Sequence, residues 1–245
     1  MIPLSKSKFK YIKSLHLKKN RLQEGKFIVE GDKSVKEFLD SDFNVKEVVA
    51  TSEFYGEVDN HLLPSEVFLV TSKELAGLGQ FKSNNAALAV VQIKEISPPR
   101  IAENEIVLAV DGINDPGNLG TIIRIADWFG ICKILLSPES VEVYNPKVVS
   151  ATKGSLTRVM VFYTNLLEQL TKYKGVIYAA DLDGQDLRDV KPIESGIILI
   201  GGETHGISKS LLQHNTRKIT VKGKGGAESL NLAVATGIIC HHLLR

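Results

Sequence analysis

Short runs that are almost entirely apolar recur along the chain between residues 106 and 222. They are IVLAVD (106–111), ICKILL (131–136), RVMVFY (158–163), GVIYAA (175–180), GIILIG (196–201) and RKITVK (217–222). Strands that are apolar on both faces are typical of a parallel sheet with helices packed on each side. The pattern therefore predicts an open α/β fold, in which ligands bind beyond the carboxyl ends of the strands.

Segments of helical spacing separate these runs. We expect helices at 118–129, 145–153, 165–173, 207–214 and 229–244. In the last of them Leu230, Val234 and Ile238 recur every fourth residue, which predicts a buried helix face.

Residues 27–93 carry a second, smaller α/β pattern. The runs FIVEG, VKEFL, VKEVVA, VFLV and AALAVVQI follow one another, and Thr71 with Glu74 has the spacing of a capping box that starts a helix. Pro98-Pro99 and many charged residues interrupt the pattern at 94–105. We therefore predict two domains, at 1–96 and at 104–245.

Composition changes this picture little. The 245 residues are 43% hydrophobic with a net charge of +2, and no run of 18 apolar residues occurs. The N-terminus is rich in Lys and lacks the apolar segment of a signal peptide, so we expect a soluble, cytoplasmic protein without membrane contact.

The distribution of charge says more. Residues 1–26 hold eight Lys or Arg and one acidic residue, and Phe9, Ile12, Leu15 and Leu22 could form an apolar stripe among them. A basic amphipathic helix of this kind either contacts phosphates or is the solvated face of a packed helix.

Neither cysteine nor histidine points to a metal site. Cys132 and Cys240 are isolated among apolar neighbours, so we interpret both as core residues. His205, His214 and the pair His241-His242 have no Cys or acidic partner at ligand spacing, so no metal is expected.

Three loops carry polar residues at strand-to-helix junctions. In the first, DGINDPGNLG, Asn118 is a suitable N-cap and Arg124 lies in the second helical turn among apolar residues. By itself, Arg124 is more simply interpreted as an ordinary solvated or salt-bridged residue.

The second loop is GGETHGIS, from Gly201 to Ser208. Gly201 and Gly206 have the spacing of a phosphate loop, but Ile207-Ser208 stands where Lys-Ser or Lys-Thr is required, so a nucleoside triphosphate site is not expected. Glu203 could cap the turn or fix a cation.

The third loop is KGKGG (222–226), followed by Ser229 and Asn231. It could be a flexible basic turn, or it could bring the backbone close to a ligand.

Taken together, N-x-G-x-x-x-R (Asn118, Gly120, Arg124), G-x-E-x-x-G (Gly201, Glu203, Gly206) and S-L-N (Ser229, Leu230, Asn231) resemble the three motifs of the SpoU or TrmH-like family. This family comprises RNA ribose 2′-O-methyltransferases of the SPOUT class. The likeness covers residues 106–244. Residues 20–95 resemble, more loosely, the RNA substrate-binding domain that precedes many such catalytic domains.

The resemblance implies S-adenosylmethionine as methyl donor, a C-terminal trefoil knot, and a homodimer whose two chains line the active site. Gly201, Val221 and Leu230 would hold the cofactor through backbone groups and apolar contact. The residues expected at the reaction are Arg124, beside the 2′-hydroxyl, and Asn118, Glu203, Ser229 and Asn231, which would orient Arg124, the ribose and the loops.

The role of Arg124 stays open between two mechanisms. A general base must release its own proton, which Arg does not readily do. Alternatively, Arg124 holds an RNA phosphate that shares the proton, while its charge stabilises the developing alkoxide.

Two further points remain open. Many relatives have Pro-Met where this chain has Lys222-Gly223, which leaves the shape of the cofactor loop undecided. We prefer ribosomal RNA as substrate because a whole domain precedes the catalytic one. The alternatives are a transfer-RNA methyltransferase, an inactive RNA-binding relative, and a nucleotide-dependent enzyme, which would lack its phosphate motif.

Overall fold

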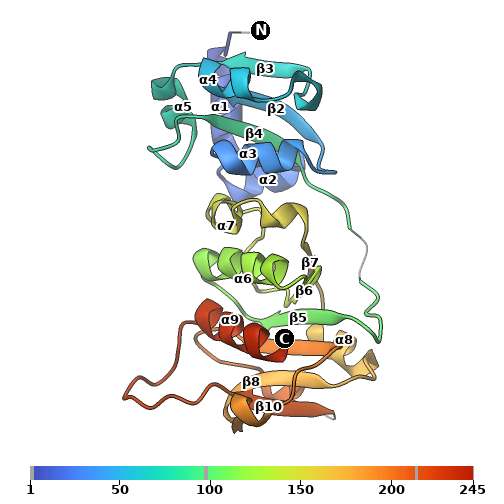
Figure 1. Ribbon diagram of the computed structural model, residues 1–245. Helices are drawn as coiled ribbons and strands as arrows, with labels where there is room; N and C mark the ends of the chain where they lie inside the picture. Colours follow the sequence, from blue (N-terminus) through green and yellow to red (C-terminus); the bar gives the residue numbers. More distant parts are fainter. Residues whose placement is uncertain (1–2, 97–98, 213–214, 245) are drawn as a thin grey trace. The chain divides into compact units, whose positions relative to one another are not determined.

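The computed structural model describes residues 3–96, 99–212 and 215–244, and its contacts divide the chain into two units (Figure 1). The first unit contains residues 1–95 together with 142–157, and the second contains 96–141 and 158–245. Pro98, part of the expected boundary, lies outside the described residues. The limits 1–96 and 104–245 stay a prediction as domain boundaries, and they do not anticipate that residues 142–157 join the first unit.

The first unit is a small α/β structure, as its sequence pattern indicates. Its elements are α1 (Lys6–Ser14), α2 (Lys18–Glu24), β1 (Lys26–Glu30), α3 (Asp32–Leu39), β2 (Val45–Ala50), α4 (Ser52–Glu57), the 3₁₀ turn η1 (Asn60–Leu62), β3 (Glu66–Leu69), α5 (Ser72–Leu78), β4 (Ala87–Gln92), α7 (Pro146–Thr152) and the 3₁₀ turn η2 (Ser155–Thr157).

The sheet of the first unit has the order β1-β4-β2-β3. β4 runs antiparallel to both β1 and β2, whereas β2 and β3 are parallel. The strands β1, β2 and β3 therefore end at the edge of the sheet where β4 begins. The capping box at the start of α5 is confirmed, because the Thr71 hydroxyl accepts from the Glu74 amide and the Glu74 carboxylate accepts from the Thr71 amide at 2.8 Å.

Residues 142–157 complete the core of the first unit. The Arg21 guanidinium, 2% exposed, donates to both carboxylate oxygens of Glu142 and to the carbonyls of Leu15 and His16. The ring of Tyr144 lies 4.5 Å from that of Phe27, centre to centre. A helix predicted at 145–153 does form, as α7, but it packs with β1.

The expected basic amphipathic helix at the N-terminus is two helices, α1 and α2. Ile12 and Leu15 are fully buried as the apolar stripe predicts, whereas Leu22 is 61% exposed. Arg21 is a buried structural charge and cannot be part of a solvated basic face.

The second unit contains the predicted parallel sheet. Its elements are β5 (Ile106–Asp111), α6 (Pro116–Trp128), β6 (Lys133–Leu136), β7 (Met160–Tyr163), α8 (Leu166–Lys172), β8 (Ile177–Asp186), the 3₁₀ turn η3 (Leu187–Asp189), β9 (Gly196–Gly201), the 3₁₀ turn η4 (Lys209–Leu211), β10 (Thr216–Thr220) and α9 (Leu232–Leu243).

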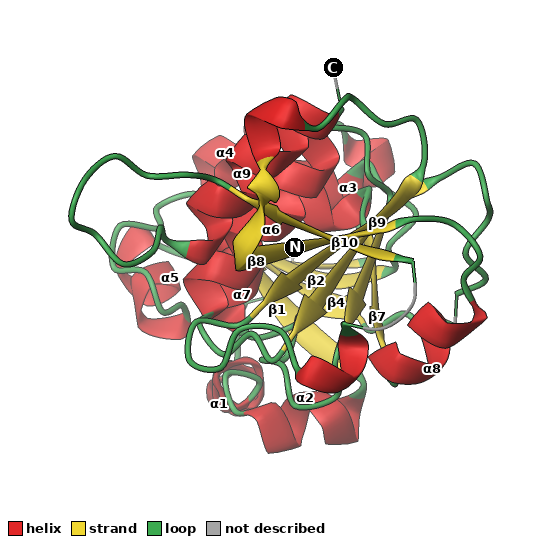
Figure 2. Ribbon diagram, turned by 90° about the horizontal axis from the view of Figure 1, so that it is seen from below, coloured by secondary structure: helices red, strands yellow, loops and turns green. Residues whose placement is uncertain are grey.

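Every strand pair of this sheet is parallel, in the order β10-β8-β9-β5-β6-β7. Leu166 and Leu170 of α8 pack with Val107 and Leu199 on one face. Helices α6 and α9 contact each other on the opposite side (Figure 2). The prediction of a sheet with helices on both faces is confirmed, and the trefoil knot stays a prediction.

Two sequence-based expectations about helices are wrong. Leu230 precedes α9 and is 48% exposed, and Val234 and Ile238 are 52% and 39% exposed. α9 buries its other side, with Leu232, Ala233, Thr236, Ile239, Cys240 and Leu243. The segment 207–214 forms only η4 within its described residues, and Gln213 and His214 lie outside them.

The two cysteines differ in a way that their neighbours in sequence did not reveal. Cys132 is exposed, so its interpretation as a core residue is wrong. Cys240 is fully buried, and burial raises the pKa of its thiol to about 12.

None of the helices in the described ranges is long and apolar enough to cross a membrane.

Candidate active site

The three polar loops of the second unit meet where the chain order of its sheet reverses. β5 lies between β6, which follows it in sequence, and β9, which the chain reaches only after β7 and β8. Loops at such a switch point diverge from the carboxyl ends of adjacent strands and leave room for a ligand. The loops after β5 and β9 both leave from this point.

The loop after β5 starts α6 one turn earlier than predicted. Asp115 is the N-cap, and its carboxylate accepts from the Asn118 amide at 2.7 Å, with Pro116 as the first helical residue. Asn118 is therefore not the N-cap. It lies in the first turn of the helix, where its side chain is free to contact the other loops.

The loop after β9 packs closely on the loop after β5. A Cβ on Gly201 would lie 2.0 Å from the carbonyl carbon of Gly206, and one on Gly202 would lie 2.3 Å from the oxygen of Gly112. Gly202 donates its amide to the Asp111 carbonyl at 2.6 Å. Both glycines are required by this close approach of backbone to backbone.

The third loop joins β10 to α9 and is open. The side chains of residues 222–230 are exposed, and within the described part of the chain the backbone groups of these residues make no hydrogen bond. The loop ends at Asn231, whose side-chain oxygen accepts from the amides of Ala233 and Val234 and so caps α9.

Three of the predicted site residues form one hydrogen-bonded chain across the three loops. Asn118 donates its side-chain amide to Glu203 Oε1 at 2.5 Å, and Asn231 donates its own to Asn118 Oδ1 at 2.9 Å. Asn118 thus uses both ends of its amide to join loops that are 85 and 113 residues away in sequence. Glu203 accepts this bond from Asn118.

Arg124 and Ser229 are not part of this chain. Arg124 lies on α6 with an exposed side chain, and among the described residues it has neither a hydrogen bond nor an ion pair. Ser229 is also exposed, with no hydrogen bond to a described residue. An unpaired guanidinium beside the switch point is available to an anionic ligand.

The residues expected to hold a cofactor line the same region. Gly201 is the buried last residue of β9, Val221 is half-buried immediately after β10, and Leu230 is exposed immediately before Asn231. Nearby, Arg188 donates to Asp186 at the end of β8, and this hydrogen bond, with a smaller contribution from Lys222, lowers the pKa of the Asp186 carboxyl to about 2.

Sequence reasoning missed Asp111 as a residue of the site. Its carboxylate is 7% exposed and accepts from the Ser208 amide at 2.8 Å, which ties the second loop to the end of β5. The sequence signal that could have identified it is the Asp at the end of an otherwise apolar strand, IVLAVD.

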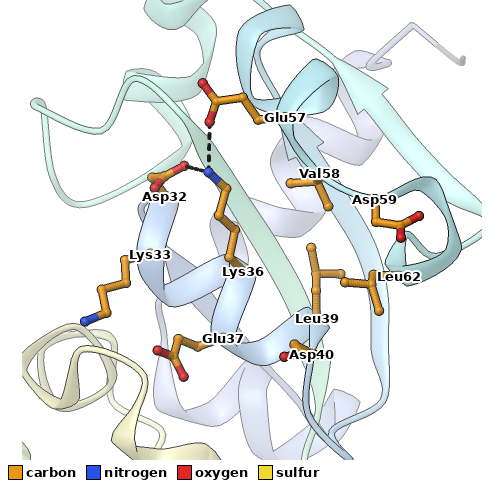
Figure 3. Close-up of a pocket in the computed structure, with 10 residues that line it drawn as sticks. All are labelled: Asp32, Lys33, Lys36, Glu37, Leu39, Asp40, Glu57, Val58, Asp59 and Leu62. Atoms are coloured by element: carbon orange, nitrogen blue, oxygen red, sulfur yellow. Dashed lines mark hydrogen bonds and ion pairs between the residues drawn. The ribbon is translucent and has the colours of Figure 1, made fainter.

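A pocket outside this site lies in the first unit, between α3, α4 and η1 (Figure 3). Its lining holds five carboxylates and two lysines, and Lys36 pairs there with Asp32 and Glu57. No predicted site residue lines it. Over the ranges that the structure describes, no cluster of His, Cys, Asp and Glu could hold a metal ion.

Comparisons with known proteins agree with the motifs. The model of the SpoU rRNA Methylase family matches residues 105–241, and that of the MRM3-like substrate binding domain matches residues 6–89. The chain is 30% identical over 246 residues to the 23S rRNA (guanosine(2553)-2′-O)-methyltransferase RlmP of Bacillus subtilis, which covers 96% of this chain and 95% of that protein.

Solved structures are similar over nearly the whole chain. A protein of the TrmH family from Porphyromonas gingivalis is 32% identical with a TM-score of 0.85, covering 99% of this chain and 98% of that one. An AdoMet-bound rRNA methyltransferase from Sinorhizobium meliloti is 27% identical with a TM-score of 0.87, covering 99% and 96%.

Proposed function

This chain belongs to the SpoU rRNA Methylase family, and we propose that it transfers a methyl group from S-adenosylmethionine to a ribose 2′-hydroxyl of structured RNA, with ribosomal RNA as substrate. The observation that carries the proposal is the hydrogen-bonded chain from Glu203 through Asn118 to Asn231 at the switch point. These three side chains come from the three motifs of the family, and each stands at a different loop of the site.

The loops fit S-adenosylmethionine by their chemistry. The backbone groups of residues 222–230 are unpaired within the described chain. At Gly201 the backbone packing leaves no room for a side chain. Val221 and Leu230 add apolar surface beside these groups. A ligand with both a polar purine and apolar segments can be held in this way, mainly through the backbone.

When bound, S-adenosylmethionine supplies an electrophilic methyl group. The chain must align the ribose oxygen with that methyl group and favour loss of the hydroxyl proton. Arg124, exposed and unpaired among the described residues, holds an RNA phosphate that shares the proton, and its charge stabilises the developing alkoxide. Asn118, Glu203 and Asn231 keep the loops in register, and Ser229 contacts the ribose.

The first unit binds RNA in this proposal. Its match to a substrate binding domain supports this role, as do the exposed Lys18 and Lys19 of α2, which stand beside the exposed Leu17 and Leu22. With RNA as substrate, the protein acts in the cytoplasm.

We also propose a homodimer that forms through α9. Leu230, Val234 and Ile238 form an exposed apolar stripe, which in a monomer would lie against water. Val234→Lys should convert the dimer to a monomer in sedimentation equilibrium. Leu182→Lys, at a side chain that is 68% exposed elsewhere in the unit, is the control. Equal masses for both variants and the wild type would contradict the α9 interface.

Mass-spectrometric mapping of ribose methylation tests the substrate. RNA from cells with and without the gene should differ at one ribosomal ribose, and purified protein should restore that mark when S-adenosylmethionine is added. A methylation change confined to transfer RNA would show that transfer RNA, and not ribosomal RNA, is the substrate. No change in either RNA, together with no binding of S-adenosylhomocysteine in calorimetry, would refute the methyltransferase.

A further inference from the structure

A turn joins α5 to β4 in the first unit (Figure 1), and the residues at its tip are exposed. The Asn84 amide donates to the Phe81 carbonyl at 3.0 Å, which closes a four-residue turn. Phe81 is 37% exposed, and Lys82 and Ser83 are also exposed. The turn therefore presents an aromatic ring next to a cation.

A buried carboxylate holds the first half of this turn. Glu30, the last residue of β1, is 7% exposed, and it accepts from the Gln80 amide at 3.0 and 3.1 Å and from the Phe81 amide at 3.4 Å. Within the described ranges it has no ion pair. Burial of an unpaired carboxylate costs free energy that these hydrogen bonds offset. A Cβ on Gly79 would lie 2.2 Å from Glu30 Oε2, so the backbone approaches the carboxylate closely.

Asn84 holds the second half. It is 8% exposed, donates to the Ala87 carbonyl at 2.9 Å and accepts from the Ala86 amide at 3.3 Å. Two buried polar side chains thus fix the backbone of a turn whose outer side chains have no partner among the described residues. The backbone that carries Phe81 is therefore fixed before any ligand binds, which lowers the entropy cost of binding.

The charges at this edge of the sheet favour an anion. Lys33 and Lys73, in the first turns of α3 and α5, lie at the same edge as Lys82, and none of the three has an ion pair with a described residue. Of the carboxylates at this edge, Asp32 is paired with Lys36 at 2.7 Å, Glu74 is engaged in the capping box, and Glu53, in the first turn of α4, is exposed.

We propose that Phe81 stacks on an unpaired base of the substrate RNA while Lys82 contacts a neighbouring phosphate, and that Glu30 is the residue that positions them. The inference rests on the proposed function for the nature of the substrate. Because Phe offers only a ring face, this contact selects unpaired RNA over duplex and is tolerant of sequence.

Binding of two RNA probes tests the contact. The probes are a fluorescein-labelled hairpin with an eight-nucleotide loop and a blunt duplex of equal length. Phe81→Ala should weaken hairpin binding about tenfold in fluorescence anisotropy, since stacking on one base contributes about 1–3 kcal/mol. Duplex binding should stay unchanged. Leu62→Ala, at a side chain 40% exposed in the same unit, should change neither affinity.

Fluorescence reports the stacking itself. Trp128 is the one Trp of the chain, so a Trp128→Phe background leaves Phe81→Trp as the sole emitter. Its emission should be quenched by the hairpin and little changed by the duplex. In the control, Leu62→Trp in the same Trp128→Phe background, the emission should change with neither RNA. Glu30→Gln in the Phe81→Trp protein should lower both the hairpin affinity and the extent of quenching.

The outcomes separate this inference from the proposed function. An unaltered hairpin affinity in Phe81→Ala, an equal loss for hairpin and duplex, or no binding of either probe by the wild type would overturn the stacking contact. A wild type that methylates ribosomal RNA despite such a result would leave the proposed function intact. Conversely, a stacking contact in a protein that methylates no RNA would refute the proposed function alone.

Discussion

Arg21 in the first unit and Arg124 in the second lie in opposite surroundings. Arg21 is 2% exposed and donates to Glu142 and two carbonyls, so all of its hydrogen bonds serve the fold. Arg124 is exposed and has no partner among the described residues. Arg21 stands in the basic segment LKKNRLQE, and Arg124 stands among apolar residues, yet it is Arg21 that is buried. The difference shows that residues distant in sequence decide whether an Arg is buried or available to a ligand. For Arg21 the deciding residue is Glu142, 121 residues away.

Arg124→Ala should produce the largest functional loss. Removal of a group that stabilises developing charge commonly costs about 10²–10³-fold in rate, and Arg124 is expected at the upper end because it also binds the phosphate. Its exposure predicts an unchanged melting temperature. Transfer of tritiated methyl groups to ribosomal RNA measures the effect, and calorimetry with S-adenosylhomocysteine should show nearly unaltered affinity. Retained turnover would refute the role of Arg124.

Arg21→Ala should produce the largest loss of stability. It leaves the Glu142 carboxylate, 11% exposed, without its cation, and breaking such a buried pair costs about 3–5 kcal/mol in the free energy of unfolding. Urea denaturation measures this loss. Lys19→Ala, at an exposed position of the same helix, should stay within about 0.5 kcal/mol of the wild type.

The double variant Arg21→Met with Glu142→Met sharpens the same contrast. Replacement of both charges by apolar side chains should recover most of the stability, because no unpaired charge remains buried. A double variant as unstable as Arg21→Ala would mean that the hydrogen bonds to Leu15 and His16 matter more than the ion pair.

Asn118→Ala should reduce methyl transfer about 10²-fold with a smaller effect on stability. It removes the link between Glu203 and Asn231, and small misplacements of a reacting group can cost this much in rate. Asn114→Ala, on the same loop, is the matched control because its side chain bonds, among the described residues, only the Gly112 carbonyl, at 3.3 Å. The effects of Asn118→Ala and Asn231→Ala should be non-additive, and simple additivity would indicate that the two residues act separately.

Thr71→Ala should have the smallest effect. It removes one half of the capping box of α5, far in sequence from the site, and should cost about 1 kcal/mol of stability. The rate of methyl transfer by the folded protein should not change. A loss of rate at a temperature where the variant is fully folded would show that α5 does more than support the first unit.

The sequence predicted the parallel sheet well because its strands are apolar on both faces, a local property of each segment. It also predicted the three loops, since each motif stands directly after a strand or before a helix. It misplaced the cap of α6 because Asp115 and Asn118 are both good capping residues, and the choice depends on where the chain turns. It took Leu230, Val234 and Ile238 as buried because a period of four does not say which of two apolar helix sides faces the core.

By itself, then, the sequence determined the order of strands and helices, the family motifs and the segments that carry them. Only the tertiary structure decided that residues 142–157 complete the core of the first unit, that Arg21 is buried, and that Asn118 joins Glu203 to Asn231. The physical reason is common to all three. Each depends on groups far apart in sequence that meet only when the sheets form, and no local spacing records which distant partner a polar side chain will find.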